Sequence, residues 1–264
     1  MKTILAASFA LSLVGCATQQ VPIANDVASR INRVAVVSMT AKSFTRQHTG
    51  LTVFGNEKEE IDITDWKIDE QYEEQIRERL SSHFGLTAVA APYPAPEFNR
   101  VNDLNGPWDA PAFWGPNWEA IESATKKYCT TNSLDAVVVL AKAKTDDFLS
   151  GTNQFFGGAG IYSRGPMGKT SMMHLLAKAA LLDCATAKPL AIRPLAARQS
   201  GLHREIMRSS PLLPLDFEES RMSMQQWSPE QKLRMQTSLA KLPQQAIAET
   251  LRSMLPARTE PPGR

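Results

Sequence analysis

The stretch Arg33-Val-Ala-Val-Val-Ser-Met39 decides the fold class, because its centre is a continuous run of small and β-branched apolar residues. Such a run is typical of a strand that is covered on both faces. A second stretch of this kind, Asp135-Ala-Val-Val-Val-Leu-Ala141, follows about a hundred residues later. Two such strands need helices on both sides of their sheet, so we predict an α/β domain with a mixed sheet.

The segment between these two strands supplies further elements. Residues 51–54 and 60–64 alternate around Gly55-Asn56, which predicts a hairpin with a loop of about five residues. From residue 69 to 83 the apolar side chains recur every four positions, which predicts an amphipathic helix ended by Gly85. Residues 86–91 are expected to form a short strand, and Asn117 to cap a second helix.

The C-terminal half continues with a hairpin and then helices. Residues 171–183 suit a helix or a strand by period alone, and we favour a strand because residues 183–188 then form a turn before a returning strand at 189–192. Ser228-Pro229-Glu230-Gln231 predicts a capping box with proline at the first helical position. Pro243 is expected to kink or restart that helix, and Pro256 to end it.

These elements predict a single mixed-sheet α/β domain with flanking helices and a C-terminal helical segment. We expect the following organisation: signal peptide 1–15, lipidated tether 16–31, mixed α/β domain 32–200, C-terminal helical extension packing on it 201–256, and disordered tail 257–264.

The N-terminus predicts export. Lys2 precedes an apolar run of about a dozen residues, shorter than the roughly 20 that a membrane-spanning helix needs. Leu13-Val14-Gly15-Cys16 resembles a bacterial lipobox, which implies cleavage before Cys16 and acylation of that residue. The alternative is an ordinary signal peptide with an incidental cysteine. Ala17, rather than Asp, follows Cys16, and the resemblance then implies the periplasmic face of the outer membrane rather than the inner membrane.

The order of elements resembles that of envelope accessory lipoproteins, such as the activators of penicillin-binding proteins and the curli secretion lipoprotein. The strands 33–39 and 135–141 and the D-x-x-T-x-K turn at 183–188 carry this resemblance. It implies a compact α/β domain and no particular functional residue.

Composition argues against nucleic-acid binding but does not decide whether two of the cysteines form a disulfide. The chain has 264 residues and a net charge of +2, without a dense stripe of Lys and Arg, which argues against nucleic acid as a partner. Besides Cys16 the cysteines are Cys129 and Cys184, and the periplasm permits disulfides. A bridge between them and two buried free thiols are both compatible with the sequence.

No catalytic or cofactor motif is complete. Gly165-Pro-Met-Gly-Lys169-Thr170 lacks the first glycine of a phosphate-binding loop, since Ser163 stands at that position. Ser163 itself lies in an incomplete nucleophile elbow, with candidate bases at His48, His83, His174 and His203. No zinc-binding motif occurs, and the acidic cluster 57–60 fits a solvated face. We therefore expect no metal and no cofactor.

Two aromatic-containing loops are the candidate contact surfaces. The proline-rich segment 92–118 and the glycine-rich segment 151–160 hold the aromatic side chains that we predict to contact a partner: Trp108, Phe113, Trp114, Phe155 and Phe156. Aromatic residues dominate binding hot spots and can stack on sugar rings. The alternative in both loops is that the aromatic side chains are buried on the core.

Together these features predict a membrane-anchored periplasmic lipoprotein that acts as a non-enzymatic accessory or assembly factor of the cell envelope through protein contacts. A lipoprotein that binds peptidoglycan or another glycan is the alternative. A serine hydrolase around Ser163 comes third.

Overall fold

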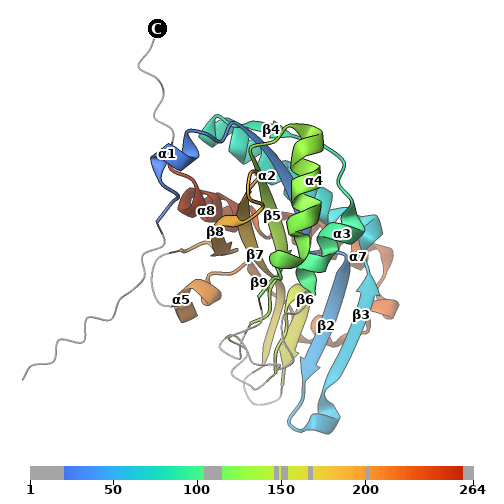
Figure 1. Cartoon of the computed structure of the whole chain (residues 1–264). Coiled ribbons are helices and arrows are strands. Elements are labelled where there is room, and N and C mark those ends of the chain that lie inside the picture. Colours follow the sequence, from blue (N-terminus) through green and yellow to red (C-terminus); the bar gives the residue numbers. More distant parts are fainter. Residues whose placement is uncertain are drawn as a thin grey trace, which may run out of the picture.

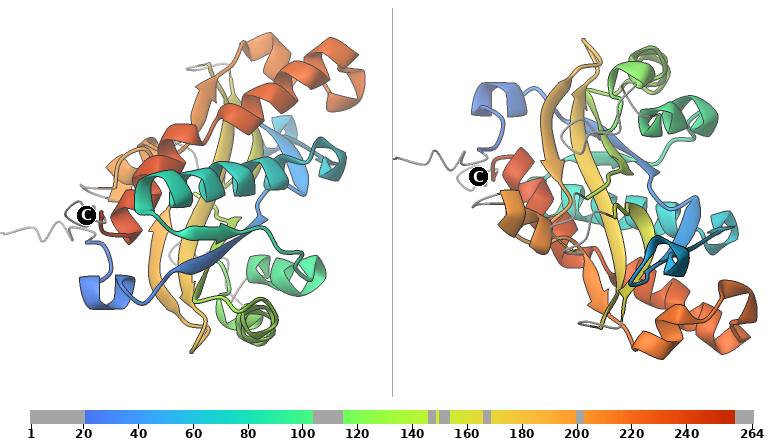
Figure 2. Two further views of the ribbon diagram at one scale, coloured as in Figure 1. Left: turned by 90° about the horizontal axis from the view of Figure 1, so that it is seen from above. Right: turned by 90° about the horizontal axis from the view of Figure 1, so that it is seen from below.

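The computed structural model describes residues 21–103, 115–145, 149, 154–165, 169–199 and 203–257. They form one mixed sheet with helices on both faces (Figure 1, Figure 2), which confirms the predicted α/β class. Along the main path of the sheet the strand order is β3-β2-β6-β7-β5-β1-β4, and β8 and β9 also pair with β7. None of the described helices is both long enough and apolar enough to span a membrane.

The two apolar stretches form the centre of one half of the sheet. β1 (Arg33–Met39) pairs in parallel with β5 (Ala136–Lys142) on one side and with β4 (Thr87–Val89) on the other. Nearly every residue of β1 and β5 is buried, because helices cover both faces of the sheet here. Three predicted strands are thereby confirmed.

The long strand β7 (Thr170–Asp183) joins the two halves of the sheet. Its residues 177–183 pair with β5, and its residues 170–176 pair with β6 (Gly158–Arg164). β5 and β6 therefore lie end to end along the same side of β7, and the chain leaves the sheet between them. β8 (Pro189–Pro194) and β9 (Leu212–Pro214) pair with the other side of β7.

The hairpin differs from the prediction. Its strands are β2 (Ser43–Thr49) and β3 (Glu57–Asp62), so the predicted first strand at 51–54 is wrong: these residues belong to the turn, with a 3-10 helix at Val53–Gly55. β2 buries Arg46 and His48 beside Phe44. Two ion pairs with β3 stabilise Arg46 there. Its Nη1 lies 3.0 Å from Glu57 Oε2, and its Nε lies 3.1 Å from Glu59 Oε2. A strand with buried charges does not show the alternation by which strands are recognised.

The strand β6 was also missed, because we assigned residues 151–160 to a glycine-rich loop. Glycine weakens strand propensity, yet Gly160 is required here. A Cβ at this position would lie 2.2 Å from the carbonyl oxygen of Thr45 on the neighbouring β2. Gly158 begins the strand at a φ of 60°, in the left-handed region that favours glycine.

Helices form a layer on each face of the sheet (Figure 2). On one face lie α2 (Ile68–Phe84), α7 (Pro229–Lys241) and α8 (Gln244–Met254), and on the other lie α3 (Ala95–Asn99) and α4 (Glu122–Asn132). The apolar stripe of α2 is buried as predicted, and Gly85 ends the helix at a φ of 59°. Ser228 and Gln231 form the predicted capping box of α7.

The ends of the chain take a larger part in the domain than predicted. Of the expected tether, residues 25–28 form α1 (Asn25–Ala28), Ile31 is buried, and the N–H of Ile23 donates to the carbonyl of Met254 at 2.9 Å. The C-terminal segment adds the strand β9 as well as α5 (His203–Arg208) and α6 (Phe217–Arg221). Its α7 and α8 share one core with α2.

Cys129 of α4 and Cys184, directly after β7, form a disulfide with their Cα atoms 5.6 Å apart. Of the two alternatives that the sequence left open, the structure therefore has the bridge. It ties α4 to the end of the central strand.

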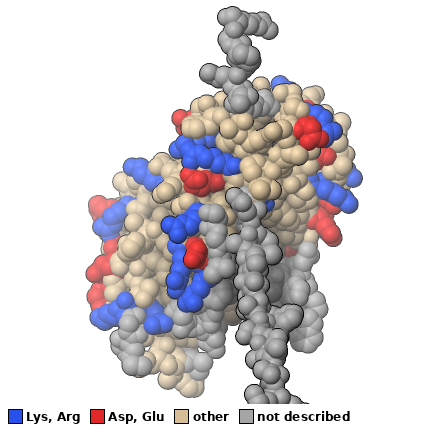
Figure 3. All heavy atoms as spheres, turned by 90° about the vertical axis from the view of Figure 1, so that its left-hand side faces the viewer, with Lys and Arg blue, Asp and Glu red and all other residues tan. Residues whose placement is uncertain are grey.

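The surface carries charges of both signs. Figure 3 shows the face on the left of Figure 1, where Lys and Arg side chains stand next to Asp and Glu side chains with uncharged surface around them. Neighbouring charges of opposite sign partly cancel each other's field.

Candidate functional site

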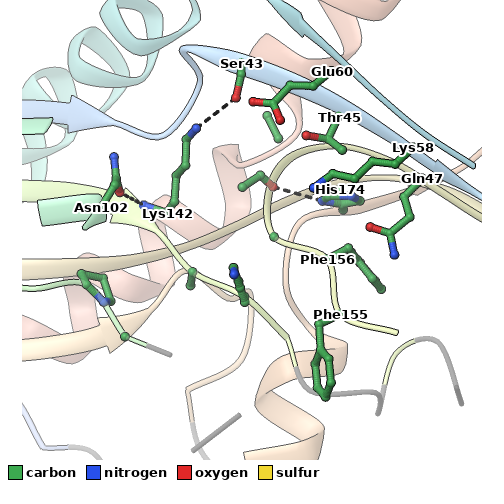
Figure 4. A pocket seen from close by; sticks show the side chains of 17 residues that line it. Ser43, Thr45, Gln47, Lys58, Glu60, Asn102, Lys142, Phe155, Phe156 and His174 are labelled. Atoms are coloured by element: carbon green, nitrogen blue, oxygen red, sulfur yellow. Dashed lines mark hydrogen bonds between the residues drawn. The ribbon is translucent and has the colours of Figure 1, made fainter. Parts of the chain in front are cut away.

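A cavity of about 300 Å³ lies where β5 ends and β6 begins, below the hairpin of β2 and β3 (Figure 4). We call it the junction pocket. It stands at the carboxyl ends of the parallel strands β1 and β5. Ligands of open α/β sheets bind at this kind of position.

The hairpin forms one wall of the junction pocket. Side chains of a strand alternate between the two faces, so Phe44, Arg46 and His48 face the core while Ser43, Thr45 and Gln47 face the pocket. The adjacent β3 contributes Lys58 and Glu60. This wall is therefore made of hydroxyl, amide and charged groups.

Lys142, the last residue of β5, extends along the opposite wall towards Ser43 (Figure 4). Its Nζ donates to Ser43 Oγ at 3.1 Å. Among the described residues no carboxylate lies within ion-pair distance of this ammonium group. Burial lowers the pKa of Lys142, and the fields of Glu60 and Asp69 oppose that shift.

Asn102 holds the ends of β1 and β5 together at the pocket. Its Nδ2 donates to the carbonyl of Met39 at 2.8 Å, and its Oδ1 accepts from the N–H of Lys142 at 2.9 Å. The backbone that carries Lys142 is therefore fixed by a side chain 40 residues away.

The inner wall contains a buried histidine. His174 Nδ1 lies 3.0 Å from the carbonyl of Gly158, and because a carbonyl only accepts, this nitrogen carries the proton. Complete burial lowers the pKa of His174 to about 4, so the ring is neutral at pH 7. Phe156 packs against this ring and is stacked on Tyr162, with ring centroids 4.4 Å apart.

Asp69 fixes the loop that leads from β1 to the pocket. Its carboxylate accepts hydrogen bonds from the hydroxyls of Ser38 and Thr40 at 2.5 and 2.9 Å, and from the N–H groups of Thr40 and Ala41. Beside it Glu73 accepts from the Ser38 N–H and the Tyr93 hydroxyl, and burial raises the pKa of Glu73. A cavity of about 470 Å³ borders this cluster, but the Asp69 carboxylate that lines it already accepts hydrogen bonds from the protein.

Ser163 and His48 form a pair on the covered face of the sheet. His48 Nδ1 lies 2.9 Å from Ser163 Oγ, since the two residues are neighbours on the parallel strands β2 and β6. Burial lowers the pKa of His48, and Arg221 and Arg46 lower it further. However, Ser163 is 0% and His48 5% exposed, and Phe217 of α6 packs on the His48 ring. A substrate has no access to Ser163 in this structure.

The other motifs of the sequence have no catalytic setting. Ser163 lies inside β6 and not at the strand-to-helix turn of a nucleophile elbow, and Lys169 and Thr170 lead into the strand β7, whereas a phosphate-binding loop leads into a helix. No group of three metal-ligating side chains occurs among the described residues.

A third feature is the hairpin tip, residues 50–56, at the end of the molecule opposite to α1 (Figure 1). Leu51 is 67% and Phe54 95% exposed. The tip is closed by hydrogen bonds from the Gly50 N–H to Asn56 Oδ1 at 3.0 Å and from the Gly55 N–H to the Thr52 carbonyl at 2.9 Å. Gly50 lies so close to Gly55 that a Cβ on it would meet that backbone at 2.6 Å.

The structure describes only two of the predicted contact residues, Phe155 and Phe156. Cys16, Trp108, Phe113 and Trp114 lie outside the described residues. Both Phe155 and Phe156 line the junction pocket. Phe155 is half-buried, whereas Phe156 is 4% exposed and belongs to a core cluster with Tyr162.

Comparison with protein-family models and with curated proteins gives no match to this chain. Function is therefore inferred from the junction pocket, the Ser163–His48 pair and the hairpin tip. Lys142 and Asn102 are not predicted as site residues by the sequence, and Leu51 and Phe54 fall in the predicted strand 51–54. A charged residue directly after the apolar stretch 135–141 was the available signal for Lys142.

Proposed function

We propose that this protein is a lipid-anchored accessory protein of the cell envelope, which binds a partner protein and does not catalyse a reaction. The observation that carries this proposal is the hairpin tip, where Leu51 and Phe54 are exposed on a turn that its own hydrogen bonds close. An exposed Phe or Leu gains about 1.5–3 kcal/mol when a partner covers it completely. A turn that is already closed by its own hydrogen bonds loses little entropy on binding, so most of this gain contributes to affinity.

The position of the tip fits an anchored protein. The expected lipid is on Cys16, five residues before Val21, and five extended residues span at most about 18 Å. The anchor therefore keeps the side of α1 near the membrane, and the hairpin tip at the opposite end points away from it. A partner in the periplasm can reach the tip without competing with the membrane.

The burial of Ser163 and His48 favours binding over hydrolysis. Their mutual hydrogen bond satisfies two polar side chains inside the core, which is the usual requirement for buried polar groups. This pair then has a structural role.

Crosslinking in cells tests the proposal. The acylated protein is crosslinked and recovered, and its adducts are identified by mass spectrometry, in parallel with the double variant Leu51→Ser/Phe54→Ser. Leu233→Ser is the matched control, since Leu233 is an apolar residue of α7 that is 63% exposed. We also include the triple variant Trp108/Phe113/Trp114→Ala, which tests the predicted proline-rich surface.

We expect one dominant partner that is lost in the tip variant and retained in the Leu233 control. An adduct pattern identical in the tip variant and the wild type contradicts a contact through the tip. Loss of the partner in the triple variant alone places the contact on the proline-rich segment. Membrane fractionation of Cys16→Ser tests the anchor separately, because this variant is expected to be released as soluble protein.

A further inference from the structure

The junction pocket combines a half-buried ammonium group with several unpaired polar groups. Lys142 Nζ has three N–H donors, and its one hydrogen bond within the described structure goes to Ser43 Oγ. Lys58 also lines the pocket, and Glu60 supplies the one carboxylate among its described lining residues. The lining residues therefore carry more positive than negative charge, which favours an anionic ligand.

The opposite wall is suited to hydroxyl groups. Thr45 and Gln47 are half-buried, and within the described residues their side chains make no hydrogen bond to the protein. The hydroxyl of Ser43 accepts from Lys142 and keeps its own proton for a ligand. Phe155 adds an aromatic ring at the rim, and such a ring packs on the C–H face of a sugar. A volume of about 300 Å³ is enough for one or two sugar rings.

We propose that the junction pocket binds an acidic sugar, whose carboxylate or phosphate is held by Lys142 and whose hydroxyl groups contact Ser43, Thr45 and Gln47. Both anions have oxygen atoms that accept from an ammonium group, so the pocket chemistry is the same for a sugar acid and a sugar phosphate. Asn102 fixes the backbone of Lys142, so the charge is positioned before the ligand arrives. This site is separate from the hairpin tip, and neither proposal depends on the other.

Isothermal titration of the Cys16→Ser protein tests the site with four probes: glucuronate, glucose 6-phosphate, glucose and inorganic phosphate. We expect at least one of the two acidic sugars to bind at least about tenfold more tightly than glucose and than inorganic phosphate. The better of the two then identifies the anion. Lys142→Met preserves the volume of the side chain and removes its charge, and we expect it to weaken the acidic sugar at least about tenfold. Lys188→Met, an exposed lysine in the turn before β8, serves as the control for the change in charge.

A measurement on the unmodified side chain covers the case in which Lys142→Met does not fold. A bound acidic sugar is expected to protect Lys142, but not Lys188, from acylation by acetic anhydride, as read by mass spectrometry, while glucose protects neither. Several results overturn the proposal: no binding of either acidic sugar, equal binding of glucose, equal binding to Lys142→Met, or inorganic phosphate binding as tightly as the sugar.

Discussion

The buried histidine of the junction pocket predicts how stability depends on pH. The pKa of His174 is about 4 in the folded protein, because the ring is fully buried, and about 6.5 in the unfolded chain. The unfolded state therefore binds a proton that the folded state does not, between these two values. The contribution of the neutral ring to stability is complete above about pH 6.5 and is lost as the pH falls towards 4. This difference in proton binding lowers the free energy of unfolding by about 2 kcal/mol between pH 7.5 and pH 5, and by about 3 kcal/mol at pH 4.

Urea unfolding of the Cys16→Ser protein at pH 7.5 and pH 5 measures this loss. Carboxylates also titrate in this range, so the informative quantity is the difference between the wild type and His174→Asn. The amide of asparagine can replace the Nδ1 donor to Gly158 but does not take up a proton. We expect the variant to be less stable at both pH values and to lose about 2 kcal/mol less than the wild type on acidification. Equal losses in the two proteins would show that His174 is not a buried neutral ring.

Three further predictions concern the rest of the domain. Replacing Cys129 and Cys184 by Ala is expected to lower the free energy of unfolding by about 4 kcal/mol, since the bridge closes a loop of 55 residues, and an unchanged urea midpoint on reduction would contradict the bridge. Asp69→Ala is expected to destabilise the protein by about 3 kcal/mol in the same assay, because Ser38, Thr40 and Ala41 lose their acceptor, whereas a change below about 0.5 kcal/mol would mean that solvent replaces it. A fluorophosphonate probe is expected to leave native Ser163 unlabelled because the residue is 0% exposed, and labelling that disappears in Ser163→Ala would restore the hydrolase hypothesis.

The sequence predicted the elements whose signal is local. The stretches 33–39 and 135–141 are apolar on both faces, the stripe of α2 repeats every four residues, and the box at Ser228 and Gln231 is formed within one turn. In each of these cases the deciding residues lie within a few positions of one another.

The missed elements depend on contacts between distant residues. In β2 the charge of the buried Arg46 is neutralised by Glu57 and Glu59, and in β6 Gly160 permits the close approach of Thr45. Residue patterns do not contain these contacts.

The candidate sites were harder still to predict. Lys142 is brought to Ser43 over a separation of 99 residues, and His48 to Ser163 over 115. The incomplete nucleophile elbow predicts Ser163 as a candidate and leaves His48 as one of four candidate bases. The packing of Phe217 on the His48 ring, which closes the pair to substrate, is visible only in the structure.

Site-specific photocrosslinking shows whether the hairpin tip contacts a partner protein. A photoreactive amino acid replaces Phe54 in the acylated protein, and in a control it replaces the exposed Leu233 of α7. We expect one strong adduct with a periplasmic protein from position 54 and none of that mass from position 233. Irradiation that gives no adduct at position 54, or the same adducts from both positions, would contradict a partner contact at the hairpin tip.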